Sequence, residues 1–418
     1  MARALDRLDR LNVPRAGQAL YWQECHGCAS SLAIARLCRT RTAPGIVVTE
    51  SQEQAFQVAN ELEFFDPEHP VDVFPDLETL PYDTFSPQSD VVSERLTFLT
   101  KLQTGAARLM VVPMRALQSR LPPAEFVRSQ TMVFETGDDF DCRTQSHALA
   151  EVGYRVVDQV LEPGDMAIRG SIFDIYPVGS AVPIRLDLFD ERIDSIREFD
   201  PESQRTTGHT DATRLMPAKE YPLDNDAIEL FRTAWHVAFD GDARNSPTYQ
   251  QVSEGIAAEG VECYLPLFFE ETQSLFDYMP AEALFILESG AHQAALDFWS
   301  EVNDRYAKLG DDPARPLLPP RRLYLHPEEI QQRLRPYSRI GLDHEKTRKR
   351  HVVSLGACEL PSVDARPRTQ DPIQRLRKFL GNVERRVLVT AETRGRLDHL
   401  DDFLKRGSVV ATQVGGFA

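Results

Sequence analysis

The sequence lacks the features that would place the chain in a membrane or staple it with disulfides. No apolar run approaches the roughly 20 residues that a membrane-spanning helix needs. Residues 1–15 alternate Arg, Asp and Leu and have no apolar core of the kind found in a signal peptide. Six cysteines scattered over 418 residues are too sparse for a disulfide framework. We therefore expect a soluble, cytoplasmic protein with no membrane partner.

The chain also has little positive charge for its length. It carries 47 Lys and Arg against 64 Asp and Glu, which gives a formal net charge of −17. That balance opposes non-specific association with DNA, whose backbone is itself anionic. A short basic run at residues 344–351 is most simply a solvated loop or helix end. Nucleic-acid binding by the chain as a whole is therefore not expected.

A working phosphate loop is missing at the first strand-to-helix turn of the expected nucleotide-type fold. Phosphate binding there requires glycines for close backbone approach, a Lys for the phosphates and a Ser or Thr for magnesium. Residues 25–31 keep only Gly27, Ser30 and Ser31 from such a set and contain no Lys. We expect a degenerate site, with no bound cofactor and no catalytic residue in this segment.

A metal or redox centre is the other chemistry that the same segment brings to mind. Cys25 and Cys28 have the spacing of half a zinc site, but no second Cys or His pair follows at a suitable distance. Cys38 is alone, and nothing near His344 or His351 completes a ligand set. Small buried thiols are favoured over a metal or redox role, so we expect no metal.

What the sequence does contain is a multidomain α/β pattern. In residues 15–123, short β-branched runs alternate with helical stretches, as in a helicase-like parallel sheet buried on both faces. We expect strands at residues 45–49, 71–74 and 108–113, and helices at 30–38, 53–64 and 93–102. This segment would be the degenerate nucleotide-fold α/β domain.

Residues 124–216 show a different pattern, which predicts an inserted α+β domain. Short alternating strands are separated by turn residues, as in an antiparallel sheet. The expected strands are residues 131–136, 155–160, 167–176, 183–189 and 195–199, with one helix at 144–151.

The remaining segments return to mixed, helix-rich sequence. Residues 1–14 and 217–350 are expected to form the second part of the large α/β domain, with a helix at 224–238. A polar, proline-containing linker is expected at 361–371. Residues 360–418 would begin a further small α/β domain, with a helix at 372–380 and a strand at 386–390, apparently truncated.

The strand at residues 183–189 is the most informative candidate surface. Because side chains alternate along a strand, Arg185 and Phe189 share one face, while aliphatic residues occupy the other. Arg169 precedes Gly170 at the end of the preceding strand. Arg and aromatic side chains on an open sheet are typical of protein-interface hot spots. Two other interpretations stay open: another domain covers this face, or Phe189 folds under the turn.

Six motifs, in order and over nearly the whole chain, resemble the N-terminal half of the transcription-repair coupling factor (Mfd) family. They are residues 80–87 (LPYDTFSP), 168–177 (IRGSIFDIYP), 183–190 (PIRLDLFD), 199–206 (FDPESQRT), 215–220 (LMPAKE) and 260–268 (GVECYLPLF). Some of these elements are shared with the excinuclease subunit UvrB.

The resemblance implies a UvrB-like fold without helicase activity and with a degenerate nucleotide site. It implies that the insert binds UvrA through the matching residues Arg169, Arg185 and Phe189. It further implies that RNA polymerase, DNA, ATP and Mg²⁺ are handled by translocase parts outside this chain, and that a C-terminal domain masks the UvrA-binding face. The module would recruit UvrA to stalled transcription complexes without catalysing a reaction.

The alternative is a UvrB-like, DNA-damage-binding ATPase subunit of the excinuclease. UvrB has an intact phosphate loop and a long aromatic hairpin that threads DNA. Here the segment after Tyr82 reaches the expected helix at residue 93 too soon to hold such a hairpin. A stand-alone metabolic α/β enzyme, the third interpretation, has no motif in its favour.

Overall fold

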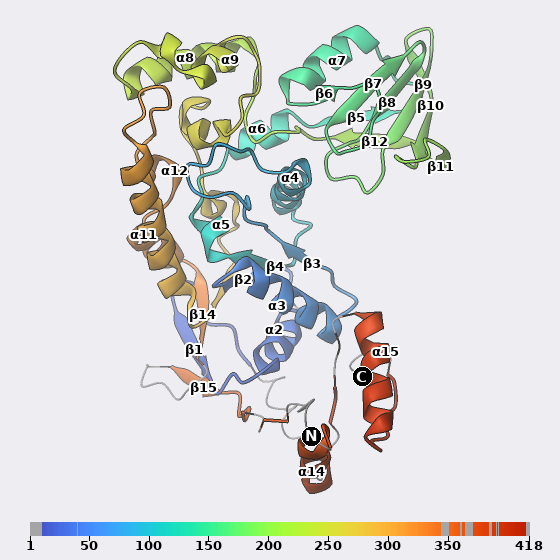
Figure 1. The fold of residues 1–418 in the computed structure, drawn as a ribbon, viewed down its shortest axis with the longest axis vertical. Coiled ribbons are helices and arrows are strands. Elements are labelled where there is room, and N and C mark those ends of the chain that lie inside the picture. The colour runs from blue at the N-terminus through green and yellow to red at the C-terminus, as the bar shows by residue number, and fades with distance from the viewer. Residues whose placement is uncertain are drawn as a thin grey trace.

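The computed structural model describes residues 11–39, 41–343, 351–359, 362–363, 371–383, 387–389, 391 and 393–414. These residues form sheets of seven, six and two strands. Figure 1 shows the seven-stranded sheet in the lower half of the molecule and the two smaller sheets at the upper right. None of the helices described is long and apolar enough to cross a membrane.

The seven-stranded sheet is parallel at every described pairing. Its strands, in spatial order, are β15 (Val352–Ser354), β1 (Ala19–Gln23), β14 (Ser338–Leu342), β13 (Leu284–Leu287), β2 (Gly45–Thr49), β4 (Leu109–Pro113) and β3 (Val71–Val73). Strands from both sides of the insert thus interleave in one sheet. The expected multidomain α/β class with a parallel sheet and separate, mainly antiparallel sheets is confirmed.

Both faces of this sheet are buried, because neighbouring residues of each central strand enter different cores. Val47 and Val111 pack in one cluster with helices α2 (Ala29–Arg39) and α3 (Gln52–Phe65). Ile46 and Val48 pack in the other cluster, against α4 (Ser89–Thr104), α5 (Met114–Gln118) and α11 (Ala291–Leu309). This two-sided burial explains why the strands are nearly continuous apolar runs.

Helix α4 begins four residues before the start predicted from the sequence. The prediction placed its first residue at 93, but the helix starts at Ser89 and buries Val91 and Val92. It ends at Gly105, whose φ of 70° allows the left-handed C-cap. The helix contacts the insert through Ser93, which accepts a hydrogen bond from Gly179, and Figure 1 draws the insert to the upper right of α4.

The inserted region forms the two smaller sheets and helices α6 (Ala124–Ser129) and α7 (Cys142–Glu151). The six-stranded sheet has the order β11 (Thr206–Thr210), β10 (Arg192–Phe199), β9 (Ile184–Phe189), β8 (Ile172–Ile175), β7 (Asp165–Arg169) and β6 (Arg155–Val156). The two-stranded sheet pairs β5 (Met132–Glu135) with β12 (Ala212–Leu215).

Three details of this insert differ from the sequence-based prediction. The single strand expected at residues 167–176 is the hairpin of β7 and β8, which turns at Gly170 with a φ of 63°. The strand expected at 155–160 keeps only two residues, because the chain then bends over the sheet and buries Val160. Strands β11 and β12 were not predicted, because their short Thr-rich sequences carry little apolar alternation.

A second core, rich in aromatic side chains, is formed by residues between 221 and 323 together with Tyr82. Helix α8 (Asn225–Ala238) contributes Phe231 and Trp235, which pack with Tyr249, Tyr264 and Phe268. The other elements here and up to β14 are η1 (Ala243–Asn245), α9 (Pro247–Ser253), η2 (Val261–Leu267), α10 (Leu275–Tyr278), α12 (Pro320–Leu323) and α13 (Pro327–Leu334).

Two helices, α14 (Gln374–Asn382) and α15 (Arg394–Arg406), follow the sheet, and Ile373 and Leu404 are buried beside them. The strand predicted at 386–390 is wrong where it is described, since Val387–Val389 are 39–46% exposed and form no strand. Strand propensity without a pairing partner does not make a strand. Residues 344–350 of the basic run and most of the predicted linker lie outside the described residues.

Candidate protein-binding site and the carboxyl edge of the parallel sheet

The three candidate residues of the insert lie on one face of its six-stranded sheet. Strand alternation puts Arg185, Asp187 and Phe189 on the same side of β9. The pairing register places Arg169 opposite Ile172, and Ile172 opposite Asp187, so Arg169 lies on that side too. The structure therefore brings the three predicted residues to a single surface.

Phe189 is the most exposed large apolar side chain of this face. It is the last residue of β9 and is 72% exposed. The two-residue turn that follows holds Asp190 and Glu191 at φ values of 47° and 61°, as in the tight turns that match strand twist. Phe189 does not fold under that turn. An apolar side chain presented in this way is available to enter a pocket on another molecule.

Arg185 is held in place by two neighbours on the same face. Its Nε and Nη2 atoms donate to both carboxylate oxygens of Asp174, at 2.6 and 2.8 Å. Asp174 is only 1% exposed, and its hydrogen bonds raise the pKa of the Arg185 guanidinium. The guanidinium also lies 4.7 Å from the ring centroid of Phe199. Among the described residues Nη1 of Arg185 makes no hydrogen bond, and the Arg185 side chain is 15% exposed.

A second charge pair lies between Arg169 and Phe189. Asp187 accepts from Arg197 Nη2 at 2.5 Å and from Ser195 Oγ at 2.8 Å. Arg169 is exposed, and its guanidinium reaches the carbonyl of Asp158. The face thus alternates cationic and anionic groups around one exposed ring. Strand alternation had already placed Asp187 on this side, without giving it a role, and sequence reasoning missed Asp174.

This face is open at one end and covered at the other. Val160, Ala167 and Phe199 form a small buried cluster where the segment after β6 crosses the sheet. The expectation of an open face therefore applies to the end that holds Arg169 and Phe189. No other domain covers that end within the described part of the chain, as both residues are exposed.

The carboxyl edge of the parallel sheet, where the sequence predicts a degenerate phosphate loop at residues 25–31, is rich in acidic side chains. Gly27 has a φ of 56° in the loop before α2, and no Lys is present there. Ser31 is 2% exposed and donates to Glu61 Oε2 at 2.6 Å. Ser31 is thus turned to a carboxylate of α3, and Ser30 beside it is only partly buried.

Glu288, which follows β13, shows how unfavourable further negative charge is at this edge. Burial first, and then the nearby charge of Glu50 after β2, raise the pKa of Glu288 to about 7. Its Oε2 atom is buried without a hydrogen-bond partner among the residues described. The edge presents carboxylates where a nucleotide-binding protein presents backbone N–H groups and a Lys.

Cys25, Cys28 and Cys38 lie before and within α2, and Cys38 is beside Gly45 at the start of β2, the opposite end of the sheet. Burial raises the pKa of Cys25 to about 11 and that of Cys38 to about 12, and it also raises the pKa of Cys28. A raised pKa disfavours the thiolate, which is the form that binds metals and attacks disulfides. Among the described residues, no group of three or more His, Cys, Asp or Glu side chains could hold a metal ion.

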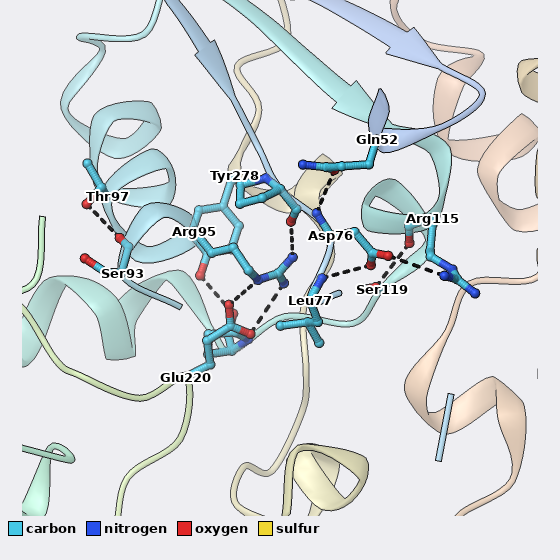
Figure 2. Close-up of polar contacts among 12 residues, drawn as sticks. Gln52, Asp76, Leu77, Ser93, Arg95, Thr97, Arg115, Ser119, Glu220 and Tyr278 are labelled. Atoms are coloured by element: carbon cyan, nitrogen blue, oxygen red, sulfur yellow. Dashed lines mark hydrogen bonds and ion pairs between the residues drawn. The ribbon is translucent and has the colours of Figure 1, made fainter. Parts of the chain in front are cut away.

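A buried ion pair joins the insert to the large domain. Arg95 of α4 is 0% exposed and donates from Nε to Glu220 Oε1 at 2.6 Å, on the segment that leaves the insert (Figure 2). Its Nη1 donates to the Pro75 carbonyl at 2.8 Å, and its guanidinium lies 4.4 Å from the Phe74 ring centroid. Ser93, also on α4, accepts from the backbone N–H of Gly179 in the insert at 2.8 Å.

The sequence did contain a signal for this junction that was overlooked. Arg95 has the helical spacing of the apolar residues Val91, Val92 and Leu99, so it points into the core with them. A charged residue at such a position must be paired to be tolerated. The continuous core that runs from α4 into the insert then fixes the two parts against each other.

Comparison with known proteins agrees with this architecture. Residues 132–221 match the model of the UvrB interaction domain. The chain is 38% identical to the transcription-repair-coupling factor of Haemophilus influenzae over 90% of this chain and 33% of the relative. It is 34% identical to that of Escherichia coli over 97% of this chain and 36% of the relative. The chain thus spans about a third of the length of these curated relatives, and it belongs to the transcription-repair-coupling factor family.

Proposed function

We propose that this chain is a UvrA-binding module that recruits the repair machinery and catalyses no reaction itself. The observation that carries the proposal is the exposed ring of Phe189 beside Arg169 and Arg185, within the residues that match the UvrB interaction domain. Arg and aromatic residues on a rigid surface are the usual anchors of protein interfaces. Because the insert is small, the interface would be of standard size or smaller.

The geometry supports a division of labour on this face. Phe189 would enter an apolar pocket of UvrA, while the free Nη1 side of Arg185 and the exposed guanidinium of Arg169 would bond carbonyl or carboxylate oxygens. Because Asp174 fixes the guanidinium of Arg185 beforehand, little side-chain entropy is lost when the partner binds. The surface is therefore suited to recognition without rearrangement.

We infer that the nucleotide site of this segment is degenerate and needs no cofactor. Glu50, Glu61 and Glu288 lie at the edge that would receive phosphates, and Ser31 is engaged with Glu61. Like charges repel, so this arrangement disfavours ATP and opposes the alternative of a UvrB-like ATPase. In the family context, ATP, Mg²⁺, DNA and RNA polymerase would be bound by parts of the protein outside this chain. A C-terminal domain would mask the insert face until the polymerase is engaged.

The test is a titration of UvrA against the parent chain and an Arg169→Ala/Phe189→Ala variant. Both side chains are exposed, so their removal leaves the insert folded, which circular dichroism checks. We expect saturable binding by the parent and a loss of at least tenfold, ~1.4 kcal/mol, in the variant.

A matched control is Phe56→Ala/Arg232→Ala, which removes an exposed Phe and an exposed Arg elsewhere on the surface. This control should bind like the parent. Equal weakening of both variants, or no binding by the folded parent, would contradict the assignment of this face.

A further inference from the structure

A second surface lies on the loop of residues 74–88, which connects β3 to α4. Phe85 is 72% exposed and Leu80 is 47% exposed, although Phe74 and Tyr82 of the same loop are buried. This loop lies in the large domain and shares no residue with the insert face. Apolar side chains that stay exposed on a fixed loop are candidates for contact with another protein.

The loop is fastened to three other parts of the large domain through both backbone and side-chain atoms. Arg305 of α11 donates to the Pro81 carbonyl at 2.5 Å, and Arg315 donates from Nη1 to the Tyr82 carbonyl at 3.0 Å. Tyr82 Oη donates to the Leu318 carbonyl at 2.9 Å. Ser86 Oγ donates to Glu262 of η2 at 2.8 Å. So many contacts make the loop a rigid platform rather than a mobile connection.

The backbone of the loop is also strained where it is most tightly held. Tyr82 has a φ of 60° and Glu78 a φ of 57°, in the left-handed region that bulky side chains rarely adopt. A Cβ on Gly260 would lie 2.8 Å from the Asp83 carbonyl oxygen, so only Gly allows η2 to approach this closely. Strain of this kind persists where the surroundings impose it, and it is concentrated at functional sites.

Acidic side chains predominate along the loop and beside it. Glu78, Asp83, Asp90, Glu94 and Glu259 flank or contact the loop; Glu259 accepts from the backbone N–H of Ser86 at 3.2 Å. Burial first, and then the charges of Asp90 and Glu78, raise the pKa of Glu94. The nearby cations Arg305 and Arg315 are turned to loop carbonyls. Such a rim repels nucleic acid and attracts a basic surface.

We propose that Phe85 and Leu80 form a second docking surface, for a protein with an apolar pocket rimmed by Lys and Arg. The rigid loop presents the two side chains at little entropic cost, and its acidic rim selects the charge of the partner. The complementary charge makes a protein the occupant, rather than DNA or a second copy of this acidic chain.

The test places a photo-crosslinking phenylalanine at position 85 of the full-length protein in its own cells and maps the crosslinked peptides. We expect crosslinks to one protein, at a site where Lys or Arg flank apolar residues. Combining the probe with Glu78→Lys/Glu94→Lys should reduce the yield at least tenfold, because both side chains are exposed and their reversal alters the rim without disturbing the core. The same probe at Phe56, an exposed Phe of α3, should not give this crosslink.

Several outcomes would overturn the proposal: no crosslink above the level at Phe56, a crosslink to DNA or to a second copy, or a yield unchanged by charge reversal. A crosslink that disappears in a Phe189→Ala background would show that the loop only extends the insert face. The proposal is independent of UvrA binding, because a crosslink that survives Phe189→Ala supports it even if UvrA does not bind.

Discussion

The insert face and the carboxyl edge of the parallel sheet are both rich in charge, but they are organised in opposite ways. On the insert face each carboxylate meets an arginine, as Asp174 meets Arg185 and Asp187 meets Arg197. At the sheet edge Glu288 faces Glu50 instead, and its carboxylate is partly neutralised by its raised pKa. Paired charges hold side chains ready for a partner, whereas crowded like charges disfavour an anionic ligand. The surface that we propose for recognition thus has paired charges, whereas the edge that we propose to be a degenerate nucleotide site has crowded like charges.

The largest effect is expected at the Arg95–Glu220 ion pair, which joins the insert to the large domain. Arg95→Met leaves Glu220, which is 7% exposed, as a buried carboxylate without its partner. Such a change should lower the free energy of unfolding by about 3–5 kcal/mol, measured by urea denaturation. The control is Arg95→Met/Glu220→Leu, which removes both charges and should recover most of the loss. If Arg95→Met were as stable as Arg95→Met/Glu220→Leu, the ion pair would not hold the insert against the large domain.

A smaller effect is expected from the carboxylate that positions Arg185. Asp174→Asn keeps the shape but weakens the hold on the guanidinium, so UvrA affinity should fall about tenfold, ~1.4 kcal/mol. In a double-mutant cycle, Asp174→Asn should cost little more once Arg185→Ala is present. The Arg185 Nε–H resonance should also shift and exchange faster in Asp174→Asn. Additive losses with an unchanged resonance would mean that Asp174 only supports the fold.

The crowded negative charge at the carboxyl edge of the parallel sheet should make the stability of the chain depend on pH. The pKa of Glu288 is about 7 in the folded chain, against 4.5 for an ordinary Glu, so the folded state holds the extra proton between these values. Stability should therefore be greatest below about pH 4.5 for this group and fall as pH rises to 7. Glu288→Gln should remove that slope and gain about 1–2 kcal/mol at pH 8, discounted for partial exposure. Parallel urea-midpoint profiles for parent and variant between pH 4.5 and 8 would contradict this.

The smallest effect is expected from added nucleotide, which should change neither the activity nor the stability of the chain. The parent chain should hydrolyse no ATP above background, and Mg²⁺–ATP should not raise its melting temperature. Ser31→Ala, which removes the hydrogen bond to Glu61, should lower stability by about 1 kcal/mol and leave the ATP response unchanged. Saturable turnover that this substitution abolished would show that the edge still binds nucleotide and would erase the contrast between the two regions.

Several elements could be predicted from the sequence because their signals are local. The apolar runs at β2 and β4 and the alternation in β9 depend only on neighbouring residues. The hairpin of β7 and β8 was taken for one strand, although its core-facing residues change phase at Gly170, from Met166 before the turn to Phe173 and Ile175 after it. Strands β11 and β12 escaped prediction since pairing, not composition, makes them strands. The strand predicted at residues 386–390 is wrong where it is described, because its strand-forming composition has no pairing strand beside it.

The sequence by itself determined that residues 25–31 lack a phosphate loop and that Arg185 and Phe189 share one side of a strand. Both follow from residue identity and from the two-residue period of a strand. Only the tertiary structure decided that Phe189 is exposed, that Asp174 fixes Arg185, and that Arg95 meets Glu220, which lies 125 positions away. Contacts between such distant positions depend on how the sheets and helices pack, and no local pattern encodes them.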